Sequence, residues 1–348
     1  QLKLGQFKQP FNLEEYGTSS NNIDFMERSY INQITPGKKI GAMLHGVPAT
    51  GLTYAASVYQ QNNFGETDSE NTGKGFAGRA TVNFAELAGW GDSVFHVGAA
   101  GFDSEYGVLP TSSSNGSTTT TGTVATNGTV VGFRSAGRGL ANAYRAQIGG
   151  NTVNAGPSMP SNAAANVENK AYGLELAMAK GPFKIQGEYT DQVFNANQYS
   201  VNSYVHADVE AYYVEALVML TGENYANWYK NGAWGGIKPT SNFDLETGKG
   251  KGAWELGVRF DAYDVSDVAA YSGSGAAGSS RIQGSQDAAK GGSAKTYTVG
   301  LKWQLTPNMR VLANYAHTKF GDSFTAVDTS LANIKKEDLL MVRSQFSF

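Results

Sequence analysis

The sequence predicts an all-β fold, a transmembrane antiparallel β-barrel. In the final segment apolar residues take alternate positions, including Leu340, Val342, Phe346 and the terminal Phe348. Most segments with this alternation run about ten or more residues, the length that crosses a bilayer at a tilt, whereas soluble strands average about half that. Short and long connections alternate along the chain, as in outer-membrane barrels. A soluble sandwich would explain the alternation but not these lengths.

About twelve segments have the period-two pattern of strands. In chain order they are residues 1–8, 38–48, 52–62, 74–88, 93–106, 171–180, 183–196, 207–221, 252–267, 295–306, 309–320 and 337–348. Because no linker, heptad or helical repeat separates them, we expect a single domain over residues 1–348.

The alternation also assigns side chains to the two faces. The clearest lipid-facing set is Tyr297, Val299, Leu301, Trp303 and Leu305. The same parity turns charged residues toward the lumen. The basic ones are Lys184, Arg259, Lys302, Arg310 and Arg343, and the acidic ones are Glu188, Glu255 and Asp261. We therefore expect a modest basic excess in the lumen. Aromatic residues expected at the membrane interfaces are Tyr54, Tyr189, Tyr263, Trp303 and Tyr315.

Connection lengths orient the barrel. Tight turns are expected at residues 49–51, 89–92, 181–182 and 307–308. Long segments are expected at residues 9–37, 63–73, 107–170, 197–206, 268–294 and 321–336. The short turns belong on the periplasmic side. Segment 222–251 is long where a short turn is expected. The stretches 111–130 and 272–294, rich in small residues, are expected to be loops.

Composition argues against several classes of function. The chain has 348 residues, no Cys and a net charge of −3, so it has no bulk attraction for nucleic acid. It lacks a run of eighteen apolar residues, so we expect no transmembrane helix. Residues 273–278 spell G-x-G-x-x-G, but no helix is expected after them, which argues against a dinucleotide site.

Catalysis and metal binding have little support in the sequence. The four histidines, none with a suitably spaced metal-binding partner, are His45, His96, His206 and His317. A paired Glu255 and Asp261 could serve a barrel enzyme, but these carboxylates more simply balance Arg259 in a wet lumen. We expect no enzyme, no cofactor and no metal.

Several motifs carry a family resemblance. At the front are Gly5-Gln6-Phe7-Lys8-Gln9-Pro10-Phe11, Thr18-Ser19-Ser20 and Phe25-Met26-Glu27-Arg28. Further along are Gly181-Pro182-Phe183, Ile237-Lys238-Pro239 and Gly252-Ala253-Trp254-Glu255-Leu256. Together they resemble the phosphate- and polyphosphate-selective porins of Gram-negative outer membranes, the porin O and P family, over essentially the whole chain.

The resemblance implies a sixteen-stranded barrel in the bacterial outer membrane, assembled as a homotrimer. The sequence supplies about twelve of those strands, so the amino-terminal strands are expected to be absent from it. The implied function is passive diffusion of small hydrophilic solutes, with ion transport and a preference for small anions. The implied partners are those solutes, outer-membrane lipid and lipopolysaccharide, and further copies of the chain.

The resemblance also implies a constriction formed by two infolded segments, residues 9–37 and 107–170. Its hydroxyl positions match Ser19 and Ser20. Arg28 lies in the first segment, and Arg134 and Arg138 fall where an arginine ladder would lie opposite it. An oxyanion must lose part of its water to pass, and fixed cations and hydroxyl donors can replace that water.

The front motif departs from the phosphate-selective pattern. Where those members carry a lysine before the Thr-Ser-Ser motif, this chain has Glu15-Tyr16-Gly17, and Asn21 replaces a second lysine. The segment is also acidic. We therefore expect only a weak preference for anions such as phosphate. The alternatives are a general or cation-preferring porin, or a barrel without a transport role, either an enzyme or an adhesin.

Overall fold

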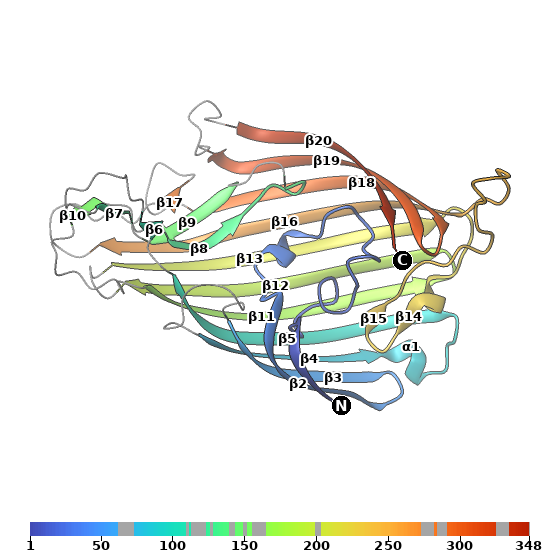
Figure 1. Cartoon of the computed structure of the whole chain (residues 1–348), viewed down its shortest axis with the longest axis horizontal. Coiled ribbons are helices and arrows are strands. Elements are labelled where there is room, and N and C mark those ends of the chain that lie inside the picture. The colour runs from blue at the N-terminus through green and yellow to red at the C-terminus, as the bar shows by residue number, and fades with distance from the viewer. Residues whose placement is uncertain are drawn as a thin grey trace.

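The computed structural model describes residues 1–61, 73–108, 111–112, 123–125, 128–138, 143–148, 152–154, 165–198, 203–272, 282–283, 291–324 and 334–347. Its main element is a twelve-stranded sheet (Figure 1). The strands are β1 (Leu2–Lys8), β2 (Lys38–Ala49), β3 (Leu52–Gln60), β4 (Lys74–Asn83), β5 (Ser93–Val108), β11 (Ala165–Lys180), β12 (Phe183–Gln198), β13 (Ser203–Met219), β16 (Ala253–Ser272), β18 (Gly292–Thr306), β19 (Met309–Phe324) and β20 (Ile334–Phe346).

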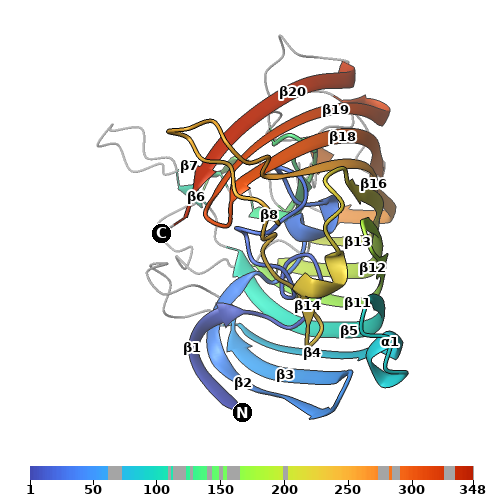
Figure 2. The ribbon, with the colours of Figure 1, turned by 90° about the vertical axis from the view of Figure 1, so that its right-hand side faces the viewer.

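The twelve strands pair in chain order, and each neighbouring pair is antiparallel. Figure 2 shows the sheet curving around a concave side, with β1 and β20 as its two edges. This confirms the all-β class and all twelve predicted strands. Among the described residues, no helix is long and apolar enough to cross a membrane.

Several predicted boundaries were wrong. Strand β11 begins at Ala165, six residues before its predicted start at 171, because its pairing with β5 and β12 extends that far. The predicted strand 74–88 ends at Asn83, where a short helix α1 (Phe84–Leu87) begins. The Asn83 side chain accepts a hydrogen bond from the Phe95 backbone N–H at 3.0 Å, which ties this corner to β5.

The two faces of the sheet differ as the alternation predicts. On the convex face, Ile185, Val258 and Val299 are exposed, while Lys184, Arg259 and Lys302 are buried on the concave side. Leu305 is an exception. It was expected to face lipid, but a bulge between Gln304 and Thr306 breaks the alternation, and its side chain is buried. Phe348 lies outside the described residues.

Residues 9–37, here called the inner segment, lie on the concave side of the sheet (Figure 2). The two ends of the segment meet, because the Gln9 N–H donates to the Gly37 carbonyl at 2.9 Å. The Gln9 side chain also donates to the Lys39 carbonyl and accepts from the Ser57 hydroxyl at 2.7 Å. One glutamine therefore closes the loop and attaches it to β2 and β3.

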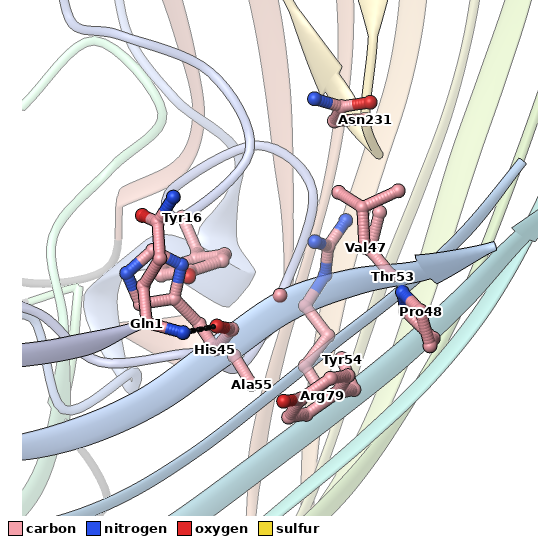
Figure 3. Close-up of a pocket in the computed structure, with 11 residues that line it drawn as sticks. Gln1, Tyr16, His45, Val47, Pro48, Thr53, Tyr54, Ala55, Arg79 and Asn231 are labelled. Carbon is pink, nitrogen blue, oxygen red and sulfur yellow. Dashed lines mark hydrogen bonds between the residues drawn. The ribbon is translucent and has the colours of Figure 1, made fainter. Parts of the chain in front are cut away.

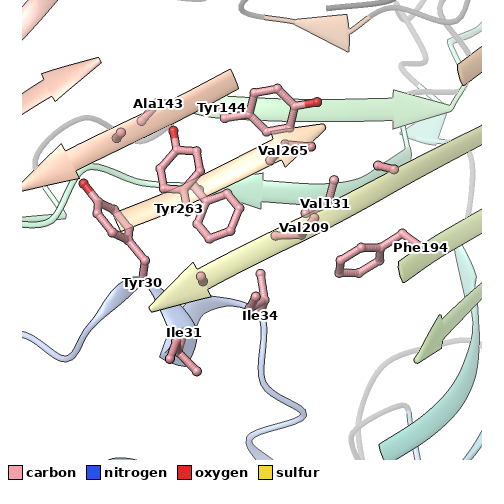
Figure 4. Packing of buried hydrophobic residues seen from close by; sticks show 14 of the residues in the cluster. Tyr30, Ile31, Ile34, Val131, Ala143, Tyr144, Phe194, Val209, Tyr263 and Val265 are labelled. Carbon is pink, nitrogen blue, oxygen red and sulfur yellow. The ribbon is translucent and has the colours of Figure 1, made fainter. Parts of the chain in front are cut away.

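A buried cluster joins the inner segment to the chain between β5 and β11 (Figure 4). The 3-10 helix η1 (Tyr30–Gln33) meets the hairpin of β8 (Gly128–Phe133) and β9 (Tyr144–Ile148). Phe133 stacks on Tyr263 with ring centroids 3.9 Å apart. Tyr263 was expected at the membrane interface, but its odd parity in β16 turns it inward.

The low-complexity stretches contain more regular structure than expected. Short strands pair there into two three-stranded sheets, one of which includes the β8–β9 hairpin. The other short strands are β6 (Thr111–Ser112), β7 (Thr123–Ala125), β10 (Thr152–Asn154) and β17 (Ile282–Gln283). Most of the remaining residues in 107–170 and 268–294 lie outside the described part of the chain.

The long connection between β13 and β16, here called the turn segment (residues 220–252), contains the 3-10 helix η2 (Tyr225–Trp228). It also contains a hairpin of β14 (Tyr229–Lys230) and β15 (Ala233–Trp234). Asn231 and Gly232 link the two strands with φ of 51° and 72°, the left-handed geometry that suits Asn-Gly. A Cβ at Gly232 would lie 2.8 Å from the Thr81 hydroxyl, so this glycine lets the hairpin approach β4.

Candidate functional site

Asp24 fixes the middle of the inner segment to the sheet. Its carboxylate accepts a hydrogen bond from the Lys184 ammonium of β12 at 2.6 Å and lies 3.5 Å from that of Lys302 on β18. Burial alone would raise the pKa of the Asp24 carboxyl, but the two ammonium groups hold that pKa below its ordinary value. Lys302 also pairs with Glu255 at 2.6 Å. One loop carboxylate thus joins strands on both sides of β13 and β16.

A second set of contacts holds the two ends of the loop. The Glu14 carboxylate accepts hydrogen bonds from the Ser29 N–H at 3.0 Å and from its hydroxyl at 2.6 Å. Arg259 of β16 lies 3.5 Å from Glu14 and 4.0 Å from Asp261. Asp261 in turn accepts the Tyr30 N–H at 3.1 Å. Asp24 and Glu14, two acids of the inner segment, therefore pair with the sheet rather than facing an open lumen.

Phe25 of the inner segment fits against two glycines of the sheet. Its ring lies 4.8 Å from the Arg259 guanidinium. A Cβ at Gly300 would lie 2.9 Å from the ring, and one at Gly257 would lie 3.1 Å from it. These glycines therefore make room for an aromatic side chain on a surface that also carries Arg259 and Lys302.

We expect Gly300→Val to displace Phe25, because the added methyl groups would overlap its ring, and overpacking of this kind costs about 1–3 kcal/mol. For the channel that the sequence predicts, the expected result is a wider, noisier pore, measured as higher single-channel conductance in planar bilayers. Gly91→Val, at a turn where nothing lies within 4 Å of the added Cβ and the backbone is not left-handed, tests for a general effect of the substitution on folding. Unchanged conductance in Gly300→Val would contradict the packing role of Phe25.

Three of the predicted lumen cations, Lys184, Arg259 and Lys302, are thus buried in ion pairs. The other two predicted lumen cations are Arg310 and Arg343. In the part of the chain that the structure describes, neither Arg310 nor Arg343 has a carboxylate within 4.0 Å. Arg310 donates to the Ile23 and Ser20 carbonyls and to the Gln345 side chain. Arg343, on the neighbouring strand, has two buried guanidinium nitrogens without a hydrogen-bond partner.

The exposed tip of the inner segment lies beside these arginines. Ser19 and Ser20 are both exposed. Arg28 donates to the Ser20 hydroxyl at 3.4 Å and to the Thr18 carbonyl at 3.1 Å, and it pairs with Glu15 at 3.0 Å. Lys8, which sequence reasoning missed, shares Glu15 at 3.4 Å. Two cations therefore share one carboxylate at the tip.

Arg134 and Arg138 contact residues 27–33 of the inner segment, whereas Arg310 contacts residues 20–23. Arg134 is exposed, and its backbone exchanges hydrogen bonds with the Gln33 side chain. Arg138 pairs with Glu27 at 3.5 Å and donates to the Arg28 carbonyl at 3.3 Å. The neighbouring Gly137 lies against Leu339 of β20, four residues from Arg343 toward the long-loop end. The cations are therefore spread along the direction of the strands rather than gathered at one point.

The turn segment closes part of the concave side from the short-turn end. The Trp234 backbone N–H donates to the Gly17 carbonyl at 3.0 Å, and the Lys184 ammonium lies 4.4 Å from the Trp234 ring centroid. On β4, the buried Arg79 pairs with Glu175 at 2.7 Å and donates to the Gly232 carbonyl at 2.9 Å. The inner segment and the turn segment thus support each other.

A cavity of about 610 Å³ lies beside this contact (Figure 3). Its lining includes Tyr16, His45, Tyr54, Arg79 and Asn231. Arg79 was not singled out in the sequence, although its inward parity on β4 was a usable signal. Arg79 matters structurally because it pairs with Glu175, a residue distant from it in the chain.

The histidines do not form a metal site within the described residues, where no group of three suitable ligands occurs. His96 is fully buried and pairs with the Tyr229 hydroxyl at 2.5 Å. His317 pairs with Asp338 at 2.7 Å on the convex face. Both have structural partners instead of a ligand set.

Comparisons with known proteins agree with the architecture. The family described as phosphate-selective porin O and P matches residues 1–348. The chain is similar to Porin O of Pseudomonas aeruginosa, with 27% identity over 172 residues, which are 49% of this chain and 34% of that protein. The match thus spans about a third of the length of this curated relative.

Solved structures that resemble the chain include OmpT, an outer membrane protein of Vibrio cholerae. Its in-vitro folded form matches with 10% identity and a TM-score of 0.48, covering 99% of this chain and 75% of that one. The outer-membrane expressed form matches with 11% identity and a TM-score of 0.46, covering 99% and 76%.

Proposed function

Because this chain belongs to the phosphate-selective porin O and P family and is a porin of the bacterial outer membrane, we propose that it is a passive diffusion channel for small hydrophilic solutes with a weak preference for anions such as phosphate. The family indicates a channel rather than an enzyme. We also propose a homotrimer surrounded by outer-membrane lipid and lipopolysaccharide.

One observation supports the anion preference above the others. Arg310 and Arg343 lie without a carboxylate partner beside the exposed tip of the inner segment, in the described part of the chain. Of the acids in this segment, Asp24 and Glu14 pair with cations of the sheet, Glu27 pairs with Arg138, and Glu15 is outnumbered by Arg28 and Lys8. The charge left at the tip is therefore positive.

The proposed preference is weak for a physical reason. The hydroxyls of Ser19 and Ser20 and the nearby guanidinium groups can replace part of the water around an oxyanion. However, Arg310 already donates to backbone carbonyls and Gln345, and Arg28 is shared with Glu15. Each of these anion-binding positions therefore binds an anion loosely, which lets the ion leave as well as enter.

Planar-bilayer recording of the purified, folded protein tests the channel itself. We expect stepwise conductance and a reversal potential on the anion side in a KCl gradient. Lack of conductance steps would contradict the channel proposal. A reversal potential on the cation side would favour the cation-preferring alternative. Phosphate should reduce the chloride current only at millimolar concentrations or above, so micromolar block would show that the binding is tighter than proposed.

Selectivity should depend on the placement of cations rather than on their number. We expect Arg343→Gln and Arg138→Ala each to move the reversal potential toward zero, whereas Lys249→Ala should leave it unchanged. Lys249 is exposed in the turn segment, and replacing it by alanine removes the same formal charge. If all three variants shift the reversal potential equally, the positions of Arg343 and Arg138 do not set the ion selectivity.

A further inference from the structure

Three lysines form a row on the convex face of the sheet. Lys295 of β18 is the register partner of Lys319 on β19, and Lys319 is the partner of Lys336 on β20. All three side chains are exposed. Directly opposed residues in antiparallel strands have Cβ atoms about 4.5–5.5 Å apart. This lysine row therefore places three ammonium groups along roughly 10 Å, across three adjacent strands.

The lysine row has no directly paired counter-charge among the described residues, although the Asp338 carboxylate is close enough to Lys336 to interact with it electrostatically. In the described part of the chain, none of its ammonium groups has a carboxylate within 4.0 Å. The nearby Asp338 accepts a hydrogen bond from the Tyr315 hydroxyl at 2.6 Å and pairs with His317 at 2.7 Å. Like charges directly opposed across strands are destabilising. An external anion would remove that repulsion.

The rows beneath the lysines locate them relative to the membrane. Next come Tyr297, His317 and Asp338, and below these Val299, Tyr315 and Leu340. The following rows are mainly apolar and end near the turn at residues 307–308, which lies on the short-turn side. Aromatic residues mark the membrane interface, and lysines just beyond it extend their ammonium groups toward the headgroups.

The charges at this height are segregated around the sheet. On β12, β13 and β16 the register partners are Asp191, Glu210 and Asp264, a row of carboxylates. Tyr172 donates to Asp191 at 2.8 Å, and Tyr189 donates to Glu210 at 2.9 Å. The lysine row therefore lies on β18, β19 and β20, while the carboxylate row lies on β12, β13 and β16.

We propose that the lysine row binds the phosphate groups of lipid A in the outer leaflet of the outer membrane. The row lies at the long-loop end of the strands, which faces outward in outer-membrane barrels. Lipid A presents two phosphates at headgroup height, and a row of three ammonium groups matches them in charge and depth. The inference depends on the outer-membrane location and not on which solute crosses the channel.

The test uses the full chain in detergent, titrated with diphosphoryl lipid A and followed by native mass spectrometry. The variant Lys295→Gln/Lys319→Gln/Lys336→Gln should bind about a hundredfold more weakly, since each lysine contributes near an anionic surface. The matched control Lys238→Gln/Lys249→Gln/Lys251→Gln removes three exposed lysines at the other end of the molecule and should bind as the parent does. Lipid A stripped of phosphate should bind the parent as weakly as the triple variant.

Other outcomes would overturn the proposal. Equal lipid A binding by parent and triple variant would do so, as would equal binding of the dephosphorylated lipid. A changed oligomeric state with unchanged lipid binding would show instead that the row meets a second copy of the chain. If the triple variant does not fold, Lys319→Gln alone should bind several-fold more weakly, and Lys319→Arg should restore binding.

Discussion

Replacing Asp24 by asparagine is expected to detach the inner segment from the sheet and raise single-channel conductance. The Asp24 carboxylate faces two buried ammonium groups, those of Lys184 and Lys302. Removing one partner of a buried ion pair typically costs about 3–5 kcal/mol, because the remaining charges lose a counter-ion. The loss falls on the docking of the inner segment, since the hydrogen bonds between the strands do not involve Asp24.

Planar-bilayer recording with a matched control measures this effect. Asp244→Asn removes an exposed carboxylate from the turn segment and should leave conductance unchanged. Asp24→Asn should also open the segment to limited proteolysis, whereas Asp244→Asn should not. If conductance and proteolysis of Asp24→Asn match those of the parent, the inner segment is held by its apolar contacts instead.

The same ion pairs should resist mild acid. The pKa of Asp24 lies below its ordinary value, so its stabilising charge is fully present above that ordinary value and is lost only as pH falls through the lower one. Between about pH 7 and pH 4 the conductance of the parent should therefore show no increase that Asp24→Asn lacks. If the conductance of the parent rises within that window and the conductance of Asp24→Asn does not, the pKa of the Asp24 carboxyl is higher than the structure indicates.

Replacing Arg79 by methionine is expected to destabilise the protein by about 3–5 kcal/mol. The substitution leaves Glu175 buried, with His96 at 3.7 Å as its remaining ion-pair partner among the described residues. It also removes the hydrogen bond that holds Gly232 against β4. Urea unfolding in lipid vesicles measures the free energy of unfolding, and the expected result is a lower midpoint with an unchanged slope.

Two further variants separate the charge from the packing. The double variant Arg79→Met/Glu175→Gln should recover part of the loss, because no unpaired charge then remains buried. Lys170→Met breaks an exposed cluster with Asp103 and Glu168 and should have no measurable effect. A loss for Arg79→Met no larger than that for Lys170→Met would mean that the Arg79–Glu175 pair contributes little.

The sequence predicted strands well because their signal is local. Alternation over a few residues sets the face of Lys184, Arg259 and Lys302, and the pairing of the strands preserves that parity. The prediction was wrong at Leu305, where a bulge adds one residue to one strand. No pattern in neighbouring residues announces that bulge.

The partners of the charged residues could not be predicted in the same way. Asp24 meets Lys184 and Lys302 because the inner segment crosses strands that are distant in the chain. An acidic loop and a basic face were each visible in the sequence, but their mutual neutralisation depends on the three-dimensional path of the loop. For the same reason, the sequence did not indicate that Trp234 of the turn segment would hydrogen-bond to Gly17 of the inner segment.

The closure of the inner segment by Gln9 has a consequence for how such channels diversify. Because Gln9 hydrogen-bonds to Gly37, the chain leaves and re-enters the sheet at nearly the same point. A loop with adjacent ends can change in length or sequence without shifting the register of β1 and β2. Grafting a different loop between these two residues is therefore a practical route to chimeric proteins with new permeability, provided that it carries a carboxylate for Lys184 and Lys302.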